Sequence, residues 1–455
     1  MKPAQGKFVT GSLMRHVVTM SLSGALGLSF TFLVDFLALW WISQLRVEAM
    51  IAAVGIAGTI QFAVMSAAIG MMIGAVALVS RTIGMGDPAR ARRIATTGLM
   101  VMVVAQTAVS ALIWIFRTQV LSASGAEGAV LDFAEHFLSI TLPSMPVIAV
   151  GIACSALLRA VGDAWRSMLV TMIAGGVAVI LDPLFIVWLG WDVTGAAISI
   201  VIARGAMCAL GLWFAIRKHD LLARPALADI RMFTRPFLAI ALPAIATQIS
   251  TPFGNWILTR EIASHGESAV AGWGVVMRMT IVAFGGIFAL SGAIGGIIGQ
   301  NYGARRPDRV AGAFWSALIF CAAYTAVTWV LMIAASDFVV RSFGLSAEGA
   351  EVVRSFTHYA AGGFVFTGAL FVANATFNNL GRPVWSTGAN WFRDGILMFP
   401  LGVALTGAFG ATGVIWANLL ANLIAGGAAA FLAWLYIRSL NRPAPGSPLR
   451  RQGAD

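Results

Sequence analysis

The sequence predicts an all-α membrane protein with 12 transmembrane helices in two pseudo-symmetric lobes of six helices each. The 455 residues are 59% hydrophobic and only 11% charged, whereas soluble proteins carry about 25% charged residues. Apolar runs long enough to cross a bilayer, about 20 residues each, recur along the whole chain. The chain also repeats itself at an offset of 219 residues, and duplicated halves are typical of membrane transporters.

The repeat is clearest at the ends of the expected helices. A shift of 219 residues places Gly84 on Gly303, Pro88 on Pro307 and Gly162 on Gly381. The same shift lays residues 39–55 over residues 258–274. Because six spans return the chain to the side on which it started, both halves have the same orientation. The expected arrangement is therefore a parallel repeat about an axis along the membrane normal.

The expected elements follow from the apolar runs in chain order. A basic start leads into a retained first helix rather than a cleaved signal sequence. An N-lobe (1–216) holds six spans, a polar cytoplasmic linker follows (217–235), and a C-lobe (236–437) holds six more. The tail (438–455) is rich in Pro, Gly and Arg and is expected to be disordered. The spans are predicted near 16–41, 49–80, 94–116, 130–158, 167–189, 194–216, 236–259, 268–300, 310–334, 355–380, 385–407 and 411–437.

The net charge of +11 reflects membrane topology. With the N-terminus inside, 22 of the 30 Lys and Arg fall in cytoplasmic segments, five in external segments and three within spans. This asymmetry follows the positive-inside rule and predicts that both termini are cytoplasmic, in a multi-pass protein of the inner membrane. We therefore expect a solvated basic face and no nucleic-acid partner.

Several site types are missing from the sequence. There is no phosphate-binding loop, so we expect no direct use of ATP. No His-x-x-x-His or Glu-x-x-His pattern lies in a span, and Cys154, Cys208 and Cys321 all fall within spans, where they are expected to pack as small residues. These observations predict a protein that is not an enzyme and has no metal or cofactor, and we expect a monomer.

Two carboxylates lie deep in spans of the first lobe. Asp35 and Asp182 are the only charged residues within the first and fifth spans. They precede the next charge at the outer boundary by 11 and 10 residues, about 15 Å of helix. Two carboxyls at matching depth suit a cation-coupling site, because such groups are costly in hydrocarbon unless they have a function. The alternative is that Asp35 caps a helix and Asp182 begins an Asp-Pro kink.

The second lobe has no carboxylate at the matched positions, where Gly254 and Leu401 stand. Its polar groups are instead amides, and three arginines also lie within spans. Arg204 lacks a charged neighbour in its own helix, so Asp182 or Asp35 is a candidate partner; Arg393 adjoins Asp394, and local pairing is the simplest explanation. The expected substrate cleft comprises Trp40, Asn255, Arg278, Asn374, Asn378, Arg393 and Asp394. For Trp40 the alternative is a place in the interfacial aromatic belt.

Four segments carry a resemblance to a known family. They are residues 34–55 (VDFLALWWISQLRVEAMIAAVG), 77–93 (ALVSRTIGMGDPARARR), 157–168 (LLRAVGDAWRSM) and 180–186 (ILDPLFI), the last followed by TGAAIS at 194–199. The chain resembles the multidrug and toxic compound extrusion (MATE) transporters, especially the bacterial DNA-damage-inducible-F branch, over essentially all 12 spans. The resemblance implies two six-helix lobes around a central cleft, and export of drug-like cations in exchange for H⁺ or Na⁺. It also implies that Asp35 and Asp182 are the coupling carboxylates.

The chain departs from the family pattern around this site. Ala178 replaces an Asn four residues before Asp182, and Ser155 replaces the Asn before the LR-x-x-G motif. A family Thr in the sixth helix falls on Ser199 or Ile200, and the Glu that another branch carries in the seventh helix is Thr251. Because Na⁺ needs several oxygen ligands, these losses favour H⁺ as the coupling ion. Ser155, Ser199 and Arg204 are the candidate neighbours of the cation site.

The sequence therefore predicts a secondary antiporter that exports small, amphipathic, cationic compounds by alternating access within membrane lipid. One alternative is a flippase for a lipid-linked precursor or another amphiphile, for which Arg204, Arg278 and Arg393 would line a basic cleft. A more remote alternative is an integral-membrane transferase, which should cluster acidic or His residues in loops at one membrane face. No such cluster is visible in the sequence.

Overall fold

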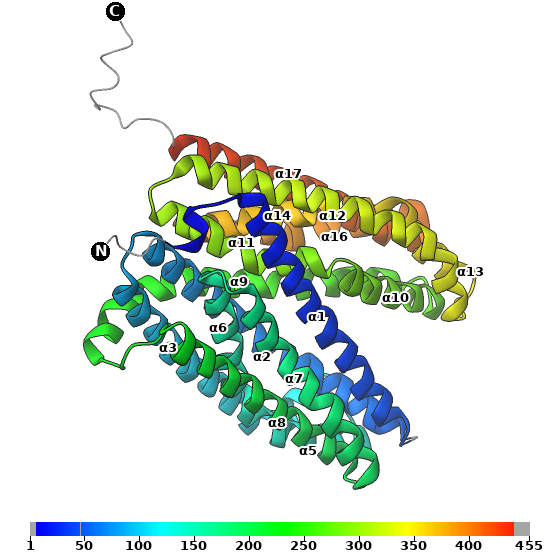
Figure 1. Ribbon diagram of the computed structural model, residues 1–455. Coiled ribbons are helices and arrows are strands. Elements are labelled where there is room, and N and C mark those ends of the chain that lie inside the picture. The colour runs from blue at the N-terminus through cyan, green and yellow to red at the C-terminus, as the bar shows by residue number, and fades with distance from the viewer. Residues whose placement is uncertain (1–5, 46, 441–455) are drawn as a thin grey trace, which may run out of the picture. The chain divides into compact units, whose positions relative to one another are not determined.

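The computed structural model describes residues 6–45 and 47–440, and this part of the chain contains helices and no strand (Figure 1). The side chains of Asp35, Leu39 and Ser43 are outside the description, as are Arg46 and the tail from residue 441. The helices of the first repeat are α1 (Leu13–Ser43), α2 (Glu48–Gly84), α3 (Pro88–Ile115), α4 (Arg117–Ala123), α5 (Gly128–Thr141), α6 (Met145–Ala160), α7 (Ala164–Asp182) and α8 (Asp192–Trp213).

The second repeat follows the same plan. Its helices are α9 (Leu227–Ala263), α10 (Glu267–Ala283), α11 (Gly285–Gly303), α12 (Pro307–Ser342), α13 (Ala347–Ser355), α14 (Phe364–Asn379), α15 (Pro383–Trp391), α16 (Met398–Phe409) and α17 (Gly413–Leu440). Short 3₁₀ turns are η1 (Lys7–Val9), η2 (Leu142–Ser144), η6 (Ala361–Gly363) and η8 (Gly410–Thr412). Wider π-helical turns are η3 (Pro183–Trp188), η4 (Phe214–Lys218), η5 (Phe356–Ala360) and η7 (Phe392–Leu397).

The predicted spans are confirmed as apolar helices. Among the described residues, ten helical stretches are long and apolar enough to cross a membrane, and the bent pair α10 and α11 makes an eleventh. One stretch, Pro383–Leu440, is 58 residues long and contains the last two predicted spans. The helix that contains the predicted seventh span, α9, begins at Leu227, nine residues before the predicted start of that span at residue 236. Polarity placed Asp229 and Arg231 in a loop, because it cannot distinguish a loop from a helix that continues beyond the apolar run.

The 219-residue offset is confirmed by the helix boundaries. Three pairs of helices begin at matched residues: Glu48 and Glu267, Pro88 and Pro307, and Ala164 and Pro383. Gly84 and Gly303 end the matched helices α2 and α11. The repeats differ between these limits, because α2 is continuous whereas its counterpart is broken at Phe284 and bent by 50°.

The break between α10 and α11 is held by one side chain from α12. The Tyr324 hydroxyl accepts a hydrogen bond from the Gly286 N–H (3.2 Å) and donates one to the Ala283 carbonyl (3.1 Å). A Cβ on Gly286 would overlap the Tyr324 ring. A broken helix frees backbone groups that a bilayer cannot satisfy, so a polar side chain must reach them.

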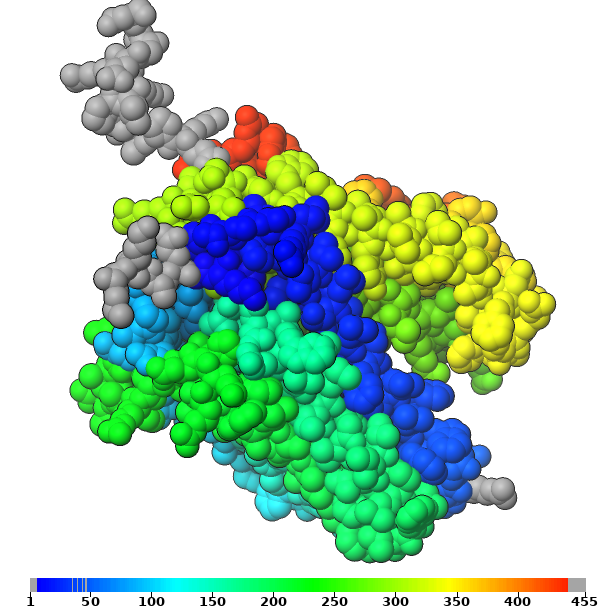
Figure 2. Space-filling model, in the orientation of Figure 1, coloured from blue at the N-terminus to red at the C-terminus, as the bar shows by residue number. Residues whose placement is uncertain are grey.

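The chain divides into two compact units that exchange short segments. One unit contains Met1–Val18, Ser80–Gly86 and Ser250–Asp455, and the other contains Thr19–Val79 and Asp87–Ile249. In the first unit, the 3₁₀ turn η1 packs on α11: the Phe8 N–H donates to Gln300 Oε1 (2.9 Å), and Asn301 and Arg309 donate to the Phe8 carbonyl (3.2 and 3.0 Å). Figure 2 shows this dark-blue segment against the yellow-green surface of α12. The lobe boundaries 1–216 and 236–437 stay a prediction.

The ends of α2 and α11 cross within this unit at two glycines. A Cβ on Gly84 would overlap the carbonyl oxygen of Gln300, and a Cβ on Gly303 would overlap that of Arg81. Arg81 and Gln300 are themselves 219 residues apart, so the two contacts are related by the repeat. Small residues allow such close helix contact, because no hydrophobic drive brings helices together in lipid.

We expect Gly303→Ala to destabilise the protein by about 1–3 kcal/mol, because the added methyl group meets backbone that cannot rotate away. Thermal unfolding in detergent measures this effect. The matched control is Gly274→Ala on α10, where an added Cβ meets nothing within 4 Å. Equal unfolding temperatures for the two variants would contradict the close crossing.

Candidate coupling and substrate-binding residues

Asp182 is a buried acid at the end of α7. The residue is 2% exposed, and Ser199 Oγ on α8 donates a hydrogen bond of 2.5 Å to its Oδ1. The next residue, Pro183, has no N–H to continue the α-helical ladder, and the chain continues as the π-helical turn η3. Such turns are frequent at functional sites. The structure thus brings together two of the predicted residues, Asp182 and Ser199.

Arg204 is held by neutral groups rather than by an acid. Its guanidinium donates to the Thr141 carbonyl (2.9 Å), to Ser144 Oγ (2.7 Å) and to Gln61 Oε1. Among the described residues it forms no ion pair, so the structure does not pair it with Asp182. The sequence offered one signal for this site, because Gln61 is a polar residue within the apolar run of α2.

The surroundings of Asp182 are apolar on the side where the family pattern has an Asn. Ala178 lies one helical turn before Asp182 and is buried in a cluster with Val34 and Ala203, with Phe30 packed against it. The cluster contributes no side-chain oxygen. Asp35 lies on α1 directly after Val34, but its side chain is outside the described part of the chain.

Ser155 belongs to a different polar cluster. It contacts Ser167 Oγ (2.9 Å), donates to the Ser167 carbonyl (3.1 Å) and accepts from Arg159 (3.0 Å). Ser167 lies on α7, 15 residues before Asp182, which is about 22 Å of helix. The structure therefore does not bring Ser155 to Asp182.

In the second repeat, Arg393 and Asp394 form a buried ion pair in the π-helical turn η7. Arg393 Nε and Nη2 donate to the two carboxylate oxygens at 2.8 and 2.9 Å. The side chains of Arg393 and Asp394 are only 6% and 2% exposed. Arg393 also donates to Thr251 Oγ1 on α9 (3.1 Å) and to Asn422 Oδ1 on α17 (3.3 Å). The local pairing expected from their adjacency is present.

Asp394 packs against the residue that matches Asp35. Gly254 lies 219 positions after Asp35, and a Cβ on Gly254 would come within 2.6 Å of Asp394 Oδ1. The absence of a side chain at Gly254 therefore makes room for the carboxylate. Matched positions of the two repeats do not reveal this relation, because Gly254 faces Asp394 on another helix.

The other predicted cleft residues are spread over several helices. Trp40 is exposed on α1 and packs edge-on against Trp41, with ring centroids 4.6 Å apart. Asn255 is half-buried on α9. Asn374 accepts a hydrogen bond from Asn390 (2.9 Å), and the backbone carbonyl of Asn378 accepts one from Arg81 (2.6 Å). The described contacts do not join these residues into one cleft.

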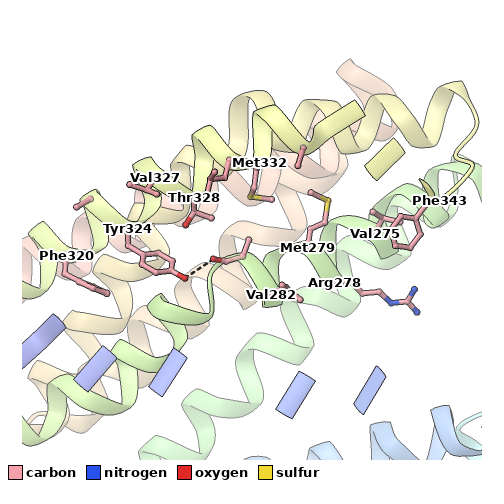
Figure 3. A pocket seen from close by; sticks show the side chains of 14 residues that line it. Val275, Arg278, Met279, Val282, Phe320, Tyr324, Val327, Thr328, Met332 and Phe343 are labelled. Atoms are coloured by element: carbon pink, nitrogen blue, oxygen red, sulfur yellow. Dashed lines mark hydrogen bonds between the residues drawn. The ribbon is translucent and has the colours of Figure 1, made fainter. Parts of the chain in front are cut away.

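Arg278 is exposed at the rim of a cavity of about 760 Å³ between α10 and α12. Figure 3 shows its guanidinium projecting from α10 away from α12, while Tyr324 reaches from α12 toward the helix break. The lining of this groove is otherwise almost entirely apolar.

Comparison with known proteins places these residues in a family context. The family model described as MatE matches residues 25–184 and 243–404. An FAD transporter of Shewanella oneidensis is 25% identical over 439 residues, which cover 95% of this chain and 97% of the relative. The multidrug export protein MepA of Staphylococcus haemolyticus is 24% identical over 450 residues, 95% of each chain.

Solved structures show the same fold. The outward-facing conformation of a multidrug resistance MATE family transporter of the MOP superfamily superposes with a TM-score of 0.89 at 20% identity, over 97% of this chain and 99% of that chain. A mutant of the Vibrio cholerae MATE transporter VcmN superposes with a TM-score of 0.89 at 21% identity, over 94% and 98%. The predicted all-α membrane fold is confirmed.

We expect removal of one partner from the buried pair to be strongly destabilising. Asp394→Asn or Arg393→Gln alone should lower stability by about 3–5 kcal/mol, because each leaves an uncompensated charge. The double variant should lose less than either single variant, since it leaves no buried charge unpaired. Unfolding in detergent measures the three variants, and additive losses would contradict the pairing.

Proposed function

We propose that this chain, which belongs to the MatE family of multidrug transporters, exports small, amphipathic, cationic compounds in exchange for protons. The proposal rests on Asp182, which is a buried acid. Its carboxylate accepts a hydrogen bond from Ser199, and no basic residue in the described part of the chain pairs with it. An acid that is neither paired nor exposed is free to exchange a small cation. We propose that Asp35 shares this role from α1, and that the protein works by alternating access.

Protons suit this site better than Na⁺. A hard cation needs several oxygen ligands, and the described side chains near Asp182 supply one hydroxyl, from Ser199. Ala178 adds only a methyl group on the side where the family pattern has an Asn. Ser155 is engaged with Ser167 and Arg159 elsewhere. A proton requires only the carboxyl group itself.

In the proposed cycle, proton binding removes charge from the first lobe, repacks α1 against its neighbours and favours release of the substrate outward. Arg204 does not compensate this change, because Gln61, Thr141 and Ser144 hold it in place. We place the protein in the inner membrane as a monomer with both termini in the cytoplasm, and we propose no cofactor.

An alternative substrate is an anionic amphiphile. Its support is the exposed Arg278 and the similarity to a relative named an FAD transporter. A flippase with an Arg-lined cleft is less well supported, because Arg204 and Arg393 are engaged in buried contacts. A transferase has the least support, since no group of three or more His, Cys, Asp or Glu side chains that could hold a metal occurs among the described residues.

We expect Asp182→Asn and Asp35→Asn each to reduce proton-driven transport of a fluorescent cationic drug to the level of empty vesicles. Proteoliposomes with an acidic lumen and a neutral exterior measure this transport. Asp192→Asn is the matched control, because Asp192 is exposed at the start of α8 with φ of 47°, a conformation that Asn tolerates. Wild-type transport by the Asp182→Asn variant would end the proposal.

Separate gradients test the coupling ion and the substrate class. We expect an imposed pH gradient to drive accumulation of the cationic drug, and an imposed Na⁺ gradient at equal pH to drive none, because Ser199 supplies the one side-chain oxygen that contacts Asp182 in the described part of the chain. The same vesicles measure the flavin dinucleotide FAD. Transport of FAD but not of the drug would replace the cationic substrate with the anionic one.

A further inference from the structure

The groove between α10 and α12 exists because of the helix break. α11 packs against α12, whereas α10 packs against α13. The 50° bend at Phe284 therefore turns α10 away from α12. The matched helix α2 is continuous. The resulting cavity of about 760 Å³ follows α12 from Phe343 to Tyr324, where the Tyr324 hydroxyl holds the break (Figure 3).

The walls of the groove are apolar and open to the surroundings of the helices. Val282 on α10 and Val327 and Leu331 on α12 are 63%, 62% and 63% exposed. In a chain that crosses a bilayer, exposed aliphatic side chains on the outside of a helix pair meet hydrocarbon. A groove of this kind is filled by an acyl chain more readily than by a water-soluble molecule.

Arg278 gives the groove one positive charge. It forms no hydrogen bond or ion pair with any residue that the structure describes. It lies 11 residues after Glu267 on α10, and helical side chains tilt toward the N-terminal end of their helix. The guanidinium is thus directed toward the membrane surface at the Glu267 end, which the charge distribution assigns to the outside. An arginine in a span requires an anionic or polar partner.

We propose that this groove binds one anionic phospholipid, with its phosphate on Arg278 and one acyl chain along α12 toward Tyr324. The single guanidinium complements the phosphate, and the apolar walls complement the chain. A lipid enters from the bilayer without crossing water, whereas free phosphate would find only one donor group. The bound chain packs beside the Tyr324 ring and so supports the bend between α10 and α11. This site shares no residue with the described contacts of Asp182.

Native mass spectrometry tests the proposal after reconstitution in equal amounts of phosphatidylglycerol and phosphatidylcholine with the same acyl chains. We expect the wild-type chain to retain one phosphatidylglycerol in preference to phosphatidylcholine. Arg278→Gln should reduce that preference about five-fold, the contribution of one basic side chain at a lipid surface. Arg341→Gln is the control, because Arg341 is a cation at the end of α12 that does not line the groove.

A second variant tests the apolar part without changing charge. Val327→Trp fills the groove and should expel the retained lipid while Arg278 remains in place. Equal retention of both lipids by the wild type, an unchanged preference in Arg278→Gln, or an equal loss in Arg341→Gln would overturn the proposal. Displacement of the lipid by millimolar inorganic phosphate would assign the site to a free anion. If the wild type had the mass of a dimer and Val327→Trp had the mass of a monomer, the groove would instead bind a second copy of the chain.

Discussion

The structure depends on one constraint: within a bilayer, every backbone polar group needs a hydrogen-bond partner inside the protein, and every charge is costly unless a polar or oppositely charged partner meets it. Tyr324 meets this constraint at the break between α10 and α11, where it serves one freed N–H and one freed carbonyl. Arg204 donates hydrogen bonds to two side-chain oxygens and one backbone carbonyl, and Arg393 forms an ion pair with Asp394. Each of these three features is therefore met by a polar group, from a distant helix for the Tyr324 and Arg204 sites and from the adjacent residue for Arg393.

The same constraint explains why the repeats agree in several helix boundaries but differ in chemistry. Helix starts and the glycine crossing of α2 with α11 are set by packing, which a duplication preserves as a whole. The polar groups of a site, in contrast, need hydrogen-bond partners only from the residues around them. One half can therefore replace an acid with an apolar residue, as at Gly254 and Leu401, or break a helix, provided that a neighbour supplies any missing hydrogen bonds. The continuous α2 and the bent pair of α10 and α11 are such alternatives.

The sequence predicted the features that depend on hydropathy and spacing. The twelve apolar runs, the 219-residue offset and the pairing of Arg393 with Asp394 are all local or periodic signals, and the helices confirm them. The contacts of Arg204 were not predictable, because Gln61 and Thr141 are neutral residues on other helices; the polarity of Gln61 within an apolar run marks it as unusual but does not indicate its partner. The break at Phe284 was hidden for a related reason: Gly285 and Gly286 are two of 49 glycines, and the Tyr324 that holds them lies 38 residues away.

The partners of two buried acids, Asp182 and Asp394, bear on where the proposed coupling takes place. In the first repeat Asp35 belongs to α1 and the facing α7 carries Gly175, whose added Cβ would come within 2.9 Å of Val34. In the second repeat the acid and the glycine have changed places. Gly254 on α9 stands at the position that matches Asp35, and Asp394 stands at the position that matches Gly175. The second acid is bound by Arg393 through both oxygens. Protonating Asp394 would leave a buried guanidinium without its counter-charge, which is strongly unfavourable. Asp182, with a hydroxyl as its described partner, carries no such penalty, and this difference supports our proposal that ion exchange takes place in the first repeat.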